Sequence, residues 1–333
     1  MTASLTGGAD AAPICARALW FPEAGACEIR DEAIAAPGEG EVLVRMLYSG
    51  ISRGTEALVF HGKVPVSEEQ RMRGPHMGGD FPFPVKYGYA AVGEVVDGCD
   101  ELSGKSVFCL HPHQDRFVVA KGMVTALPEA LPARRAVLAA NMETALNIVW
   151  DAGVQPGDRV AVFGAGVVGS LVAFLSRQIV GTETLLIDRD PGRRDLASSL
   201  GLAFADSNAV DGEFDILINA SGAAAALGDA LEHAGQEARI VEASWHGDRV
   251  VGLPLGGAFH SKRLSIVSSQ VGAIPAARRA RWDFARRLAK ALDLLCDDRL
   301  DALISGETAF DTLATSYPDI LSDPHTLCHR IRY

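Results

Sequence analysis

The part of the chain before Pro132 alternates between apolar and polar positions in short runs, which glycine, proline and acidic residues separate. A period of two predicts strands with one buried face. Six strands are expected, at residues 15–21, 27–34, 41–49, 90–97, 105–110 and 116–120. The amino-terminal part is therefore predicted to be rich in β-structure.

Two polar segments interrupt this pattern. Residues 50–56, GISRGTE, are predicted to form a chemically dense loop between strands. Residues 61–88 form a longer irregular segment, and a loop of this length in a compact domain is usually a functional cover or disordered. The end of this segment, FPFPVKYGY (81–89), favours an ordered element packed on the body of the domain.

The pattern changes after Pro132. A helical spacing over residues 133–153 ends at Gly153. Apolar strands then alternate with helices: strands are expected at 158–164, 184–189, 214–221, 238–244 and 264–270, and helices from 167 and around 193–201 and 224–235. This alternation indicates an α/β fold with a doubly wound parallel sheet. A basic amphipathic helix (276–298) and a short strand (327–333) follow.

The most informative motif is GxGxxG, formed by Gly164, Gly166 and Gly169 directly between a strand and a helix. The first glycine allows a tight turn, the second a close approach to a pyrophosphate, and the third close packing of helix on strand. The helix amino terminus adds N–H donors and a partial positive charge. The motif predicts a dinucleotide site that also includes Ala165, Val167 and Val168.

Asp188 ends the next strand, 24 residues after Gly164. A carboxylate near this spacing binds a ribose and repels a 2′-phosphate, which favours NAD. Arg189, Arg193 and Arg194 follow closely and could stabilise a 2′-phosphate, so NADP remains an alternative cofactor. The ends of the later strands should line the rest of the cofactor cleft, and they carry small residues that could equally serve packing: Ser221, Ser244 and Ser269.

Composition and charge narrow the classes of protein. The chain has 333 residues, 48% of them hydrophobic and 22% charged, which is typical of a globular protein. Its net charge of −11 argues against a general nucleic-acid binder, so the arginines of 276–298 are interpreted as a solvated helix face. Residues 160–176 lack charge but are short and rich in glycine, and they predict a buried strand and helix rather than a membrane span.

The amino terminus has no basic start followed by an apolar core, so no secretory signal is expected. The six cysteines form no CxxC pair, which favours reduced thiols in the cytoplasm. Two domains are expected: a nucleotide-binding domain over 139–271, and a catalytic domain over 1–138 and 272–333 in which residues 1–15 are disordered.

This order of elements, with VQPGDRVAVFGAGVVG (154–169), resembles the medium-chain dehydrogenase/reductase superfamily over nearly the whole chain from Ala16. The resemblance implies a GroES-like catalytic domain beside a Rossmann domain. It also implies a homodimer that pairs through the strand at 264–271, and an arginine, here Arg53, that reaches the cofactor pyrophosphate. For Arg53 an ion pair with Glu56 in solvent is an equal alternative.

The departures from the superfamily concern zinc. Where zinc-dependent members have a cysteine, a histidine and a glutamate, this chain has Ser52, Tyr89 and Ala90, and residues 141–143 stand near another ligand position. Hydroxyl, phenol and methyl groups are poor zinc ligands. The four-cysteine structural zinc lobe is missing too. We therefore expect no metal.

One other metal site needs consideration, because Cys109, His111 and His113 alternate along CLHPH and a strand would place them on one face. Pro112 disturbs a regular strand, however, and single strands rarely carry a complete site. A pocket-lining role is expected for His113 and a surface position for His111.

Without a metal, hydrogen-bond donors must stabilise the negative charge that develops on a substrate oxygen during hydride transfer. We expect Tyr89 to donate to that oxygen and Ser52 to assist, although Tyr89 packed in the core and Ser52 capping a turn are alternatives. Glu56 and Glu143 are further candidates for proton handling, since burial raises the pKa of a carboxyl group.

The expected function is thus zinc-independent, NAD(P)(H)-dependent interconversion of an alcohol and a carbonyl in a small-molecule substrate. The glycine-threonine-glutamate ending of 50–56 and Tyr89 also resemble the bacteriochlorophyllide a dehydrogenase branch, although 61–87 has no counterpart there. A zinc-free quinone or enone reductase, or a catalytically silent NAD(P)(H)-binding redox sensor or partner protein, are alternatives.

Overall fold

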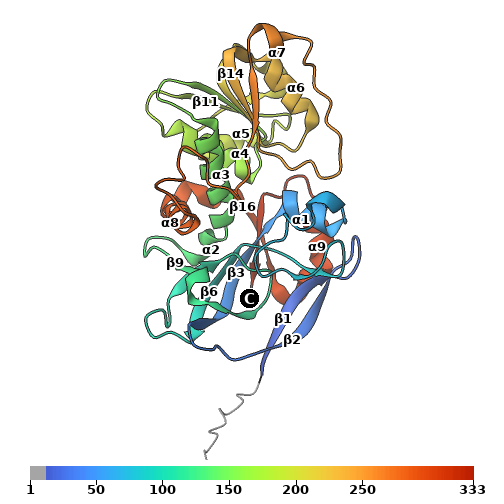
Figure 1. Cartoon of the computed structure of the whole chain (residues 1–333), viewed down its shortest axis with the longest axis vertical. Coiled ribbons are helices and arrows are strands. Elements are labelled where there is room, and N and C mark those ends of the chain that lie inside the picture. Colours follow the sequence, from blue (N-terminus) through green and yellow to red (C-terminus); the bar gives the residue numbers. More distant parts are fainter. Residues whose placement is uncertain (1–12) are drawn as a thin grey trace, which may run out of the picture.

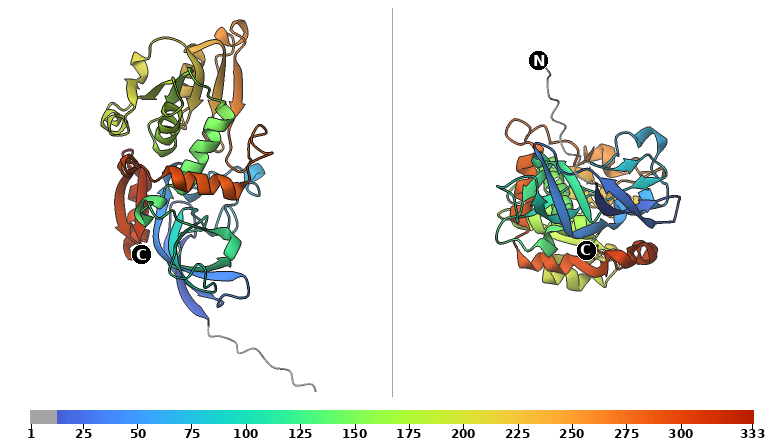
Figure 2. Two further views of the ribbon diagram at one scale, coloured as in Figure 1. Left: turned by 90° about the vertical axis from the view of Figure 1, so that its left-hand side faces the viewer. Right: turned by 90° about the horizontal axis from the view of Figure 1, so that it is seen from below.

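The computed structural model describes residues 13–333. It consists of a β-rich unit and a nucleotide-binding unit, which meet along helix α3 (Ala139–Ala152) (Figure 1). The left view of Figure 2 shows α8 (Phe284–Leu294) lying across this junction beside α3. α3 ends, as predicted, at Gly153, which adopts a left-handed conformation with φ +70°.

Two sheets form the β-rich unit. The larger has seven strands in the order β16-β17-β3-β6-β7-β9, with β8 beside β3, and the smaller has the order β2-β1-β5-β4. The strands of the larger sheet are β3 (Glu41–Ser52), β6 (Ala91–Asp97), β7 (Ser106–Cys109), β8 (Arg116–Ala120), β9 (Val124–Ala126), β16 (Ile304–Ala309) and β17 (Cys328–Arg332). Those of the smaller are β1 (Ile14–Phe21), β2 (Glu28–Ile34), β4 (Gly78–Gly79) and β5 (Val85–Lys86). Because β17 pairs with β3, the end of the chain returns to the amino-terminal unit.

The nucleotide-binding unit has a six-stranded parallel sheet in the order β12-β11-β10-β13-β14-β15. Its strands are β10 (Arg159–Phe163), β11 (Glu183–Asp188), β12 (Ala203–Asp206), β13 (Phe214–Asn219), β14 (Ala234–Glu242) and β15 (Ser265–Ser268). Its helices are α4 (Val167–Arg177), α5 (Arg193–Ser199), α6 (Ala224–Glu232) and α7 (Ala258–Ser261). The strand order reverses between β10 and β13, and ligands of such sheets bind at the carboxyl ends beside that point.

Alternate residues of β10 pack into two separate cores, because successive side chains of a strand point to opposite faces. Val160 and Val162 belong to the core that includes α3 and α4, whereas Ala161 and Phe163 belong to the core that includes α6. Both faces of the sheet are covered, as the uncharged run at 160–176 predicts. The α3 core continues into the β-rich unit, so one apolar layer joins the two units.

The predicted loop at 50–56 is wrong. β3 continues to Ser52, and helix α1 (Arg53–Phe60) begins at the next residue. The Glu56 carboxylate accepts a hydrogen bond of 2.7 Å from the Ser52 backbone N–H, which ties the helix start to the strand end. The polar residues of GISRGTE therefore belong to a fixed strand-to-helix corner.

The segment 61–88 is ordered at its end, as predicted. β5 pairs with β1, and Lys86 bonds to Glu32 at 2.7 Å. The Phe81–Pro82 and Phe83–Pro84 peptide bonds are cis.

Several elements lie outside the expectations. β9, β12, β16 and helix α9 (Leu313–Ser322) were not predicted, and α8 begins only at Phe284, where Asp283 caps it by accepting from Arg286 N at 2.8 Å. The remaining short helices are α2 (Ala133–Ala136), η1 (Val66–Glu68), η2 (Lys121–Met123), η3 (Ser207–Ala209), η4 (Asp298–Leu303) and η5 (Phe310–Thr312).

The disorder expected for residues 1–15 falls mostly outside the described residues, but Ile14 and Cys15 already belong to β1. Between residues 13 and 333, no helix has both the length and the apolar character needed to cross a membrane.

Candidate active site

A cavity of about 650 Å³ opens between the two units. Its walls come from the carboxyl ends of β10, β11, β13 and β14 on one side, and from the β3–α1 corner and the start of α3 on the other. The cavity reaches from the glycine turn to Ser52 and Tyr89 without interruption. We call this cavity the cofactor cleft.

The glycine turn has the geometry that a pyrophosphate needs. Gly164 has φ +105°, and a Cβ there would lie 2.6 Å from Ser221 Cα. A Cβ on Gly169 would lie 1.9 Å from the Gly164 carbonyl oxygen, so only glycine permits this packing of α4 on β10. A Cβ on Gly166 would meet no atom within 4 Å and would project into open space, and Gly166 lines the cleft. Val167 and Val168 line it as well, whereas Ala165 is buried.

Asp188 lies at the carboxyl end of β11 in the wall of the cleft. Its carboxylate accepts from Ala165 N at 2.7 Å and from Asp190 N at 2.9 Å. These two bonds hold the carboxylate beside the glycine turn, where a ribose would lie. Arg189 and Arg193 line the same end of the cleft, and the Arg193 guanidinium donates to the carbonyl oxygen of Pro324 in the β-rich unit at 2.7 Å.

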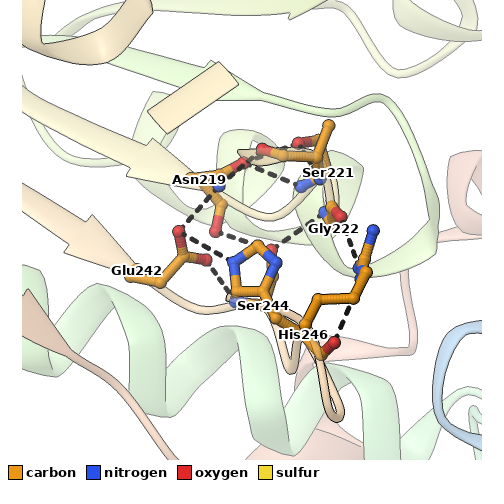
Figure 3. A network of polar contacts seen from close by, with 8 residues as sticks. Asn219, Ser221, Gly222, Glu242, Ser244 and His246 are labelled. Carbon is orange, nitrogen blue, oxygen red and sulfur yellow. Dashed lines mark hydrogen bonds and ion pairs between the residues drawn. The ribbon is translucent and has the colours of Figure 1, made fainter. Parts of the chain in front are cut away.

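A polar network joins the ends of β13 and β14 (Figure 3). The Asn219 amide donates to Glu242 Oε2 at 2.8 Å and accepts from Ser221 Oγ at 2.6 Å, while Ser244 N donates to Glu242 Oε1 at 2.7 Å. Gly222 N donates to Ser244 Oγ at 2.9 Å, and His246 Nε2 lies 3.4 Å from Glu242 Oε2. This network fixes Ser221 and Ser244 in the wall of the cleft.

Ser269 does not join this network. Its hydroxyl donates to Asp151 at 2.6 Å, and it is not among the residues that line the cleft. The expected cofactor contact of Ser269 is therefore not supported by its position, because the chain past β15 turns toward α3.

The other end of the cleft, which we call the substrate end, is lined by uncharged side chains of both units: Ile51, Ser52, Thr55, Leu58, Tyr89, Asn141, Thr144 and Trp245. Asn141 Nδ2 donates to Ser52 Oγ at 3.4 Å. Burial and the nearby Glu56 charge raise the pKa of Tyr89 to about 12, although hydrogen bonds with Ser52 and Thr55 oppose this. Tyr89 is thus a neutral phenol beside Ser52.

Glu56 and His113 lie behind this wall and not in it. Both side chains are fully buried, and His113 Nε2 lies 3.0 Å from Glu56 Oε2. The expectation that His113 lines the pocket is wrong, because its ring packs under Gly88 and bonds to Ser49 Oγ at 2.8 Å. Glu56 reaches Ser52 only through the backbone N–H, so it cannot touch a substrate in the cleft.

Glu143 has a structural partner. Its carboxylate accepts from the buried Arg287 of α8 at 3.0 Å, and Arg287 also bonds to Asn147 and to the Val271 carbonyl oxygen. Burial raises the pKa of Glu143, with Arg287 opposing the shift. Glu143 is not among the cleft-lining residues, so its position supports fixing α8 on α3 rather than proton transfer.

Arg53 lines the cleft and donates to the Asp323 carbonyl oxygen at 3.2 Å. Burial and the nearby Arg193 lower the pKa of Arg53. A solvent ion pair with Glu56 is ruled out by the burial of Glu56. The positive charges of Arg53 and Arg193 repel each other at one end of the cleft, and an anionic group such as a pyrophosphate could bind both guanidinium groups there.

Cys109, His111 and His113 do not converge. His111 is buried rather than at the surface, where it stacks on Phe117 at 3.9 Å between ring centres and its Nδ1 lies 3.0 Å from the Pro112 carbonyl oxygen. Among residues 13–333, no three His, Cys, Asp or Glu side chains are grouped so that they could hold a metal ion.

Trp245, Thr144, Asn219 and Glu242 were missed from the sequence. Thr144, on α3, and Trp245, after β14, line the cleft, whereas Asn219 and Glu242 end β13 and β14 and bond to Ser221 and Ser244. The sequence signal for two of them was that Glu242 ends an apolar strand and Trp245 comes shortly after it.

No protein-family model matches the chain. It is 25% identical to D-guloside 3-dehydrogenase of Escherichia coli K12 over 313 residues, which cover 84% of this chain and 88% of that protein. Among solved structures, L-idonate 5-dehydrogenase from E. coli K-12 superposes with a TM-score of 0.79 at 16% identity, over 96% of this chain and 99% of the other. An alcohol dehydrogenase from E. coli CFT073 complexed with NADH gives 0.76 at 18% identity, over 96% and 99%.

The chain therefore has the fold of the medium-chain dehydrogenase/reductase proteins, a GroES-like domain beside a Rossmann domain, as the motifs predict. The relatives support the expectations of a nicotinamide cofactor and of an NAD(P)-dependent dehydrogenase. They do not favour a catalytically silent protein.

Proposed function

We propose that the protein is a zinc-independent, NAD(P)-dependent oxidoreductase that interconverts an alcohol and a carbonyl. The observation that carries this proposal is the single cavity that joins the glycine turn to Ser52 and Tyr89. A ligand held at the glycine turn and a substrate beside Tyr89 would share this space. When bound, the cofactor supplies the hydride acceptor or donor at its nicotinamide C4.

Specific residues would hold this cofactor. The N–H groups at the start of α4 and the Arg53 guanidinium would hold the pyrophosphate, and Asp188 the ribose hydroxyls. We favour NAD, since Asp188 would repel a 2′-phosphate. Ser221 and Ser244 would line the cleft beyond the glycine turn.

At the substrate end, Tyr89 would donate a hydrogen bond to the substrate oxygen. A neutral phenol can stabilise the negative charge that develops there and can give up its proton during carbonyl reduction. Ser52, oriented by Asn141, would supply a second hydroxyl. In the reverse direction the same hydroxyls would accept the alcohol proton and pass it to solvent.

Zinc independence is supported by the chemistry of the side chains. Serine, tyrosine and asparagine surround the site of reaction, and Zn²⁺ prefers thiolate, imidazole and carboxylate ligands. Glu56, which accepts from Ser52 N, and His113 are bonded to each other and buried behind the wall.

The substrate class follows from the lining. The eight residues of the substrate end are uncharged, four of them carry a hydroxyl or an amide, besides the phenol of Tyr89, and Trp245 offers a flat aromatic face. This suits a neutral substrate with several hydroxyl groups, and a relative that oxidises a guloside is consistent with it. We further infer a cytoplasmic protein with reduced thiols, since all six cysteines are free.

The test is Tyr89→Phe, assayed by NAD(P)H absorbance on a panel of polyols, glycosides and their keto forms. We expect kcat to fall roughly 10²-fold with little change in cofactor affinity, because one proton donor is lost. Tyr48→Phe, which alters a tyrosine outside the cleft, serves as the matched control. Full activity of Tyr89→Phe would refute the assignment, and stoichiometric zinc in the purified active enzyme would refute the metal-free mechanism.

A further inference from the structure

Behind the substrate end lies a buried group of polar side chains that the proposed reaction does not use. It consists of Glu56 on α1, His113, Ser49 on β3, Tyr317 on α9 and the terminal Tyr333. Glu56, His113, Ser49 and Tyr317 are 0% exposed. A buried carboxylate so close to a reaction centre needs an explanation, since burying a charge is costly.

Glu56 accepts three hydrogen bonds. Ser52 N donates to Oε1 at 2.7 Å, Tyr317 Oη to Oε2 at 2.5 Å, and His113 Nε2 lies 3.0 Å from Oε2. A carboxylate with several donors is stabilised in its ionised form.

The rest of the group fixes where the protons lie. If His113 is neutral and carries its proton on Nε2, then Tyr333 donates to Ser49, Ser49 donates to His113 Nδ1, and every proton has an acceptor. A proton on Nδ1 would make Ser49 an acceptor from His113. Either the Ser49 or the Tyr333 hydroxyl proton would then lack an acceptor among the described residues. The satisfied arrangement has an ionised Glu56, a neutral His113 and a net charge of −1.

No full cation offsets this charge. Within residues 13–333, Glu56 forms no ion pair with lysine or arginine, whereas the other buried glutamate near the cleft, Glu143, is paired with Arg287. The charge of Glu56 acts on neighbouring phenols, since it contributes to raising the pKa values of Tyr87, Tyr89 and Tyr317.

We propose that Glu56 is an uncompensated buried anion that favours binding of the oxidised, positively charged nicotinamide ring over binding of the neutral reduced ring. The inference rests on the proposed function, since it places the reacting end of the cofactor beside Ser52 and Tyr89. Hydride transfer requires reacting atoms roughly 3–3.5 Å apart. Glu56 accepts from Ser52 N on the side of Ser52 away from the cleft. The Glu56 carboxylate and a nicotinamide ring in the cleft would therefore lie on the order of 10 Å apart.

The expected size of the effect follows from Coulomb's law. At an effective dielectric constant of about 20, a unit charge at about 10 Å changes the relative affinity for the two cofactor forms on the order of tenfold. When the bound NAD⁺ oxidises an alcohol, a hydride leaves the carbinol carbon for nicotinamide C4, the alcohol becomes a carbonyl, and the hydroxyl proton passes to solvent.

The test measures binding without turnover. NADH is titrated by fluorescence, and NAD⁺ by competition with it, for the wild type and for Glu56→Gln, which keeps the shape and removes the charge. We expect the ratio of the dissociation constants, NAD⁺ over NADH, to rise on the order of tenfold in Glu56→Gln. An unchanged ratio would overturn the proposal while leaving the proposed function intact, whereas a wild type that binds neither form would instead refute the proposed function.

Tyr317→Phe is the matched control. It removes one donor to Glu56 and loosens the same packing, but keeps the charge. We expect its ratio to stay at the wild-type value or to fall, because the anion is less offset. If Glu56→Gln does not fold, Tyr317→Phe provides the test. A rise in its ratio of the NAD⁺ and NADH dissociation constants would overturn the proposal, because it would show that packing, and not charge, sets the cofactor preference.

Discussion

Tyr89 keeps its proton over the whole neutral range, because burial and the charge of Glu56 raise its pKa to about 12. A phenol that is protonated below this pKa remains a hydrogen-bond donor there, and only a rise in pH through the pKa would remove it. We therefore expect carbonyl reduction to show no loss of kcat from Tyr89 up to about pH 11. A kcat profile over pH measures this, with circular dichroism to exclude unfolding. A basic limb near pH 9 that Tyr89→Phe abolishes would contradict it.

For single residues, the sequence predicts the position in the site correctly where that position depends on neighbours close in the chain. Gly164, Gly166 and Asp188 lie where their spacing along one strand, turn and strand requires. Glu56 and His113 were expected in the pocket, and their true neighbours, Tyr317 and Ser49, come from distant segments. A polar residue in a sequence does not reveal whether it faces a cavity or a buried partner.

The turn between β10 and α4 depends on two glycines for different reasons. A Cβ on Gly169 would lie 1.9 Å from the Gly164 carbonyl oxygen, whereas one on Gly166 would meet no protein atom within 4 Å. We expect Gly169→Ala to destabilise the fold by about 1–3 kcal/mol through overpacking. Gly166→Ala should fold like the wild type but bind the cofactor on the order of tenfold more weakly, because the methyl group occupies pyrophosphate space.

Denaturant unfolding and NADH titration of both variants separate these effects. Gly122→Ala, on η2, is the control, since its Cβ would also meet no atom within 4 Å and Gly122 does not line the cleft. Equal losses of stability in Gly166→Ala and Gly169→Ala would contradict the assignment.

Elements were predicted well where apolar periodicity is strong and poorly where pairing is not local. The strands β10, β11, β13 and β14 are buried and continuous in the sequence. β16 carries polar residues and finds its place only by pairing with β17, which in turn pairs with β3. The corner at GISRGTE was taken for a loop because its polar residues satisfy one another: Glu56 bonds to Ser52 N and permits a helix to start there.

For the whole molecule, the fold brings side chains of both units together in one cleft. α3 belongs to a core that extends into both units, so Asn141 and Thr144 at its start are held beside Ser52 and the glycine turn. Arg193 of the nucleotide-binding unit also bonds to Pro324 of the other unit. The sequence motifs predict each unit, but the substrate end requires both.

The open edge of the parallel sheet bears on assembly. β15 pairs with β14 on one side, and in the described part of the chain no strand pairs with its other side. Unpaired edge strands readily accept another strand, and a two-fold axis would bring β15 of a second copy onto this edge. We infer a homodimer, and we expect Ser268→Lys, which places a charge on this exposed edge, to shift it toward monomer in sedimentation experiments. Ser67→Lys, at an exposed position of the β-rich unit, should leave it a dimer. A wild-type monomer, or a Ser268→Lys variant that stays dimeric at low concentration, would place the interface elsewhere or refute it.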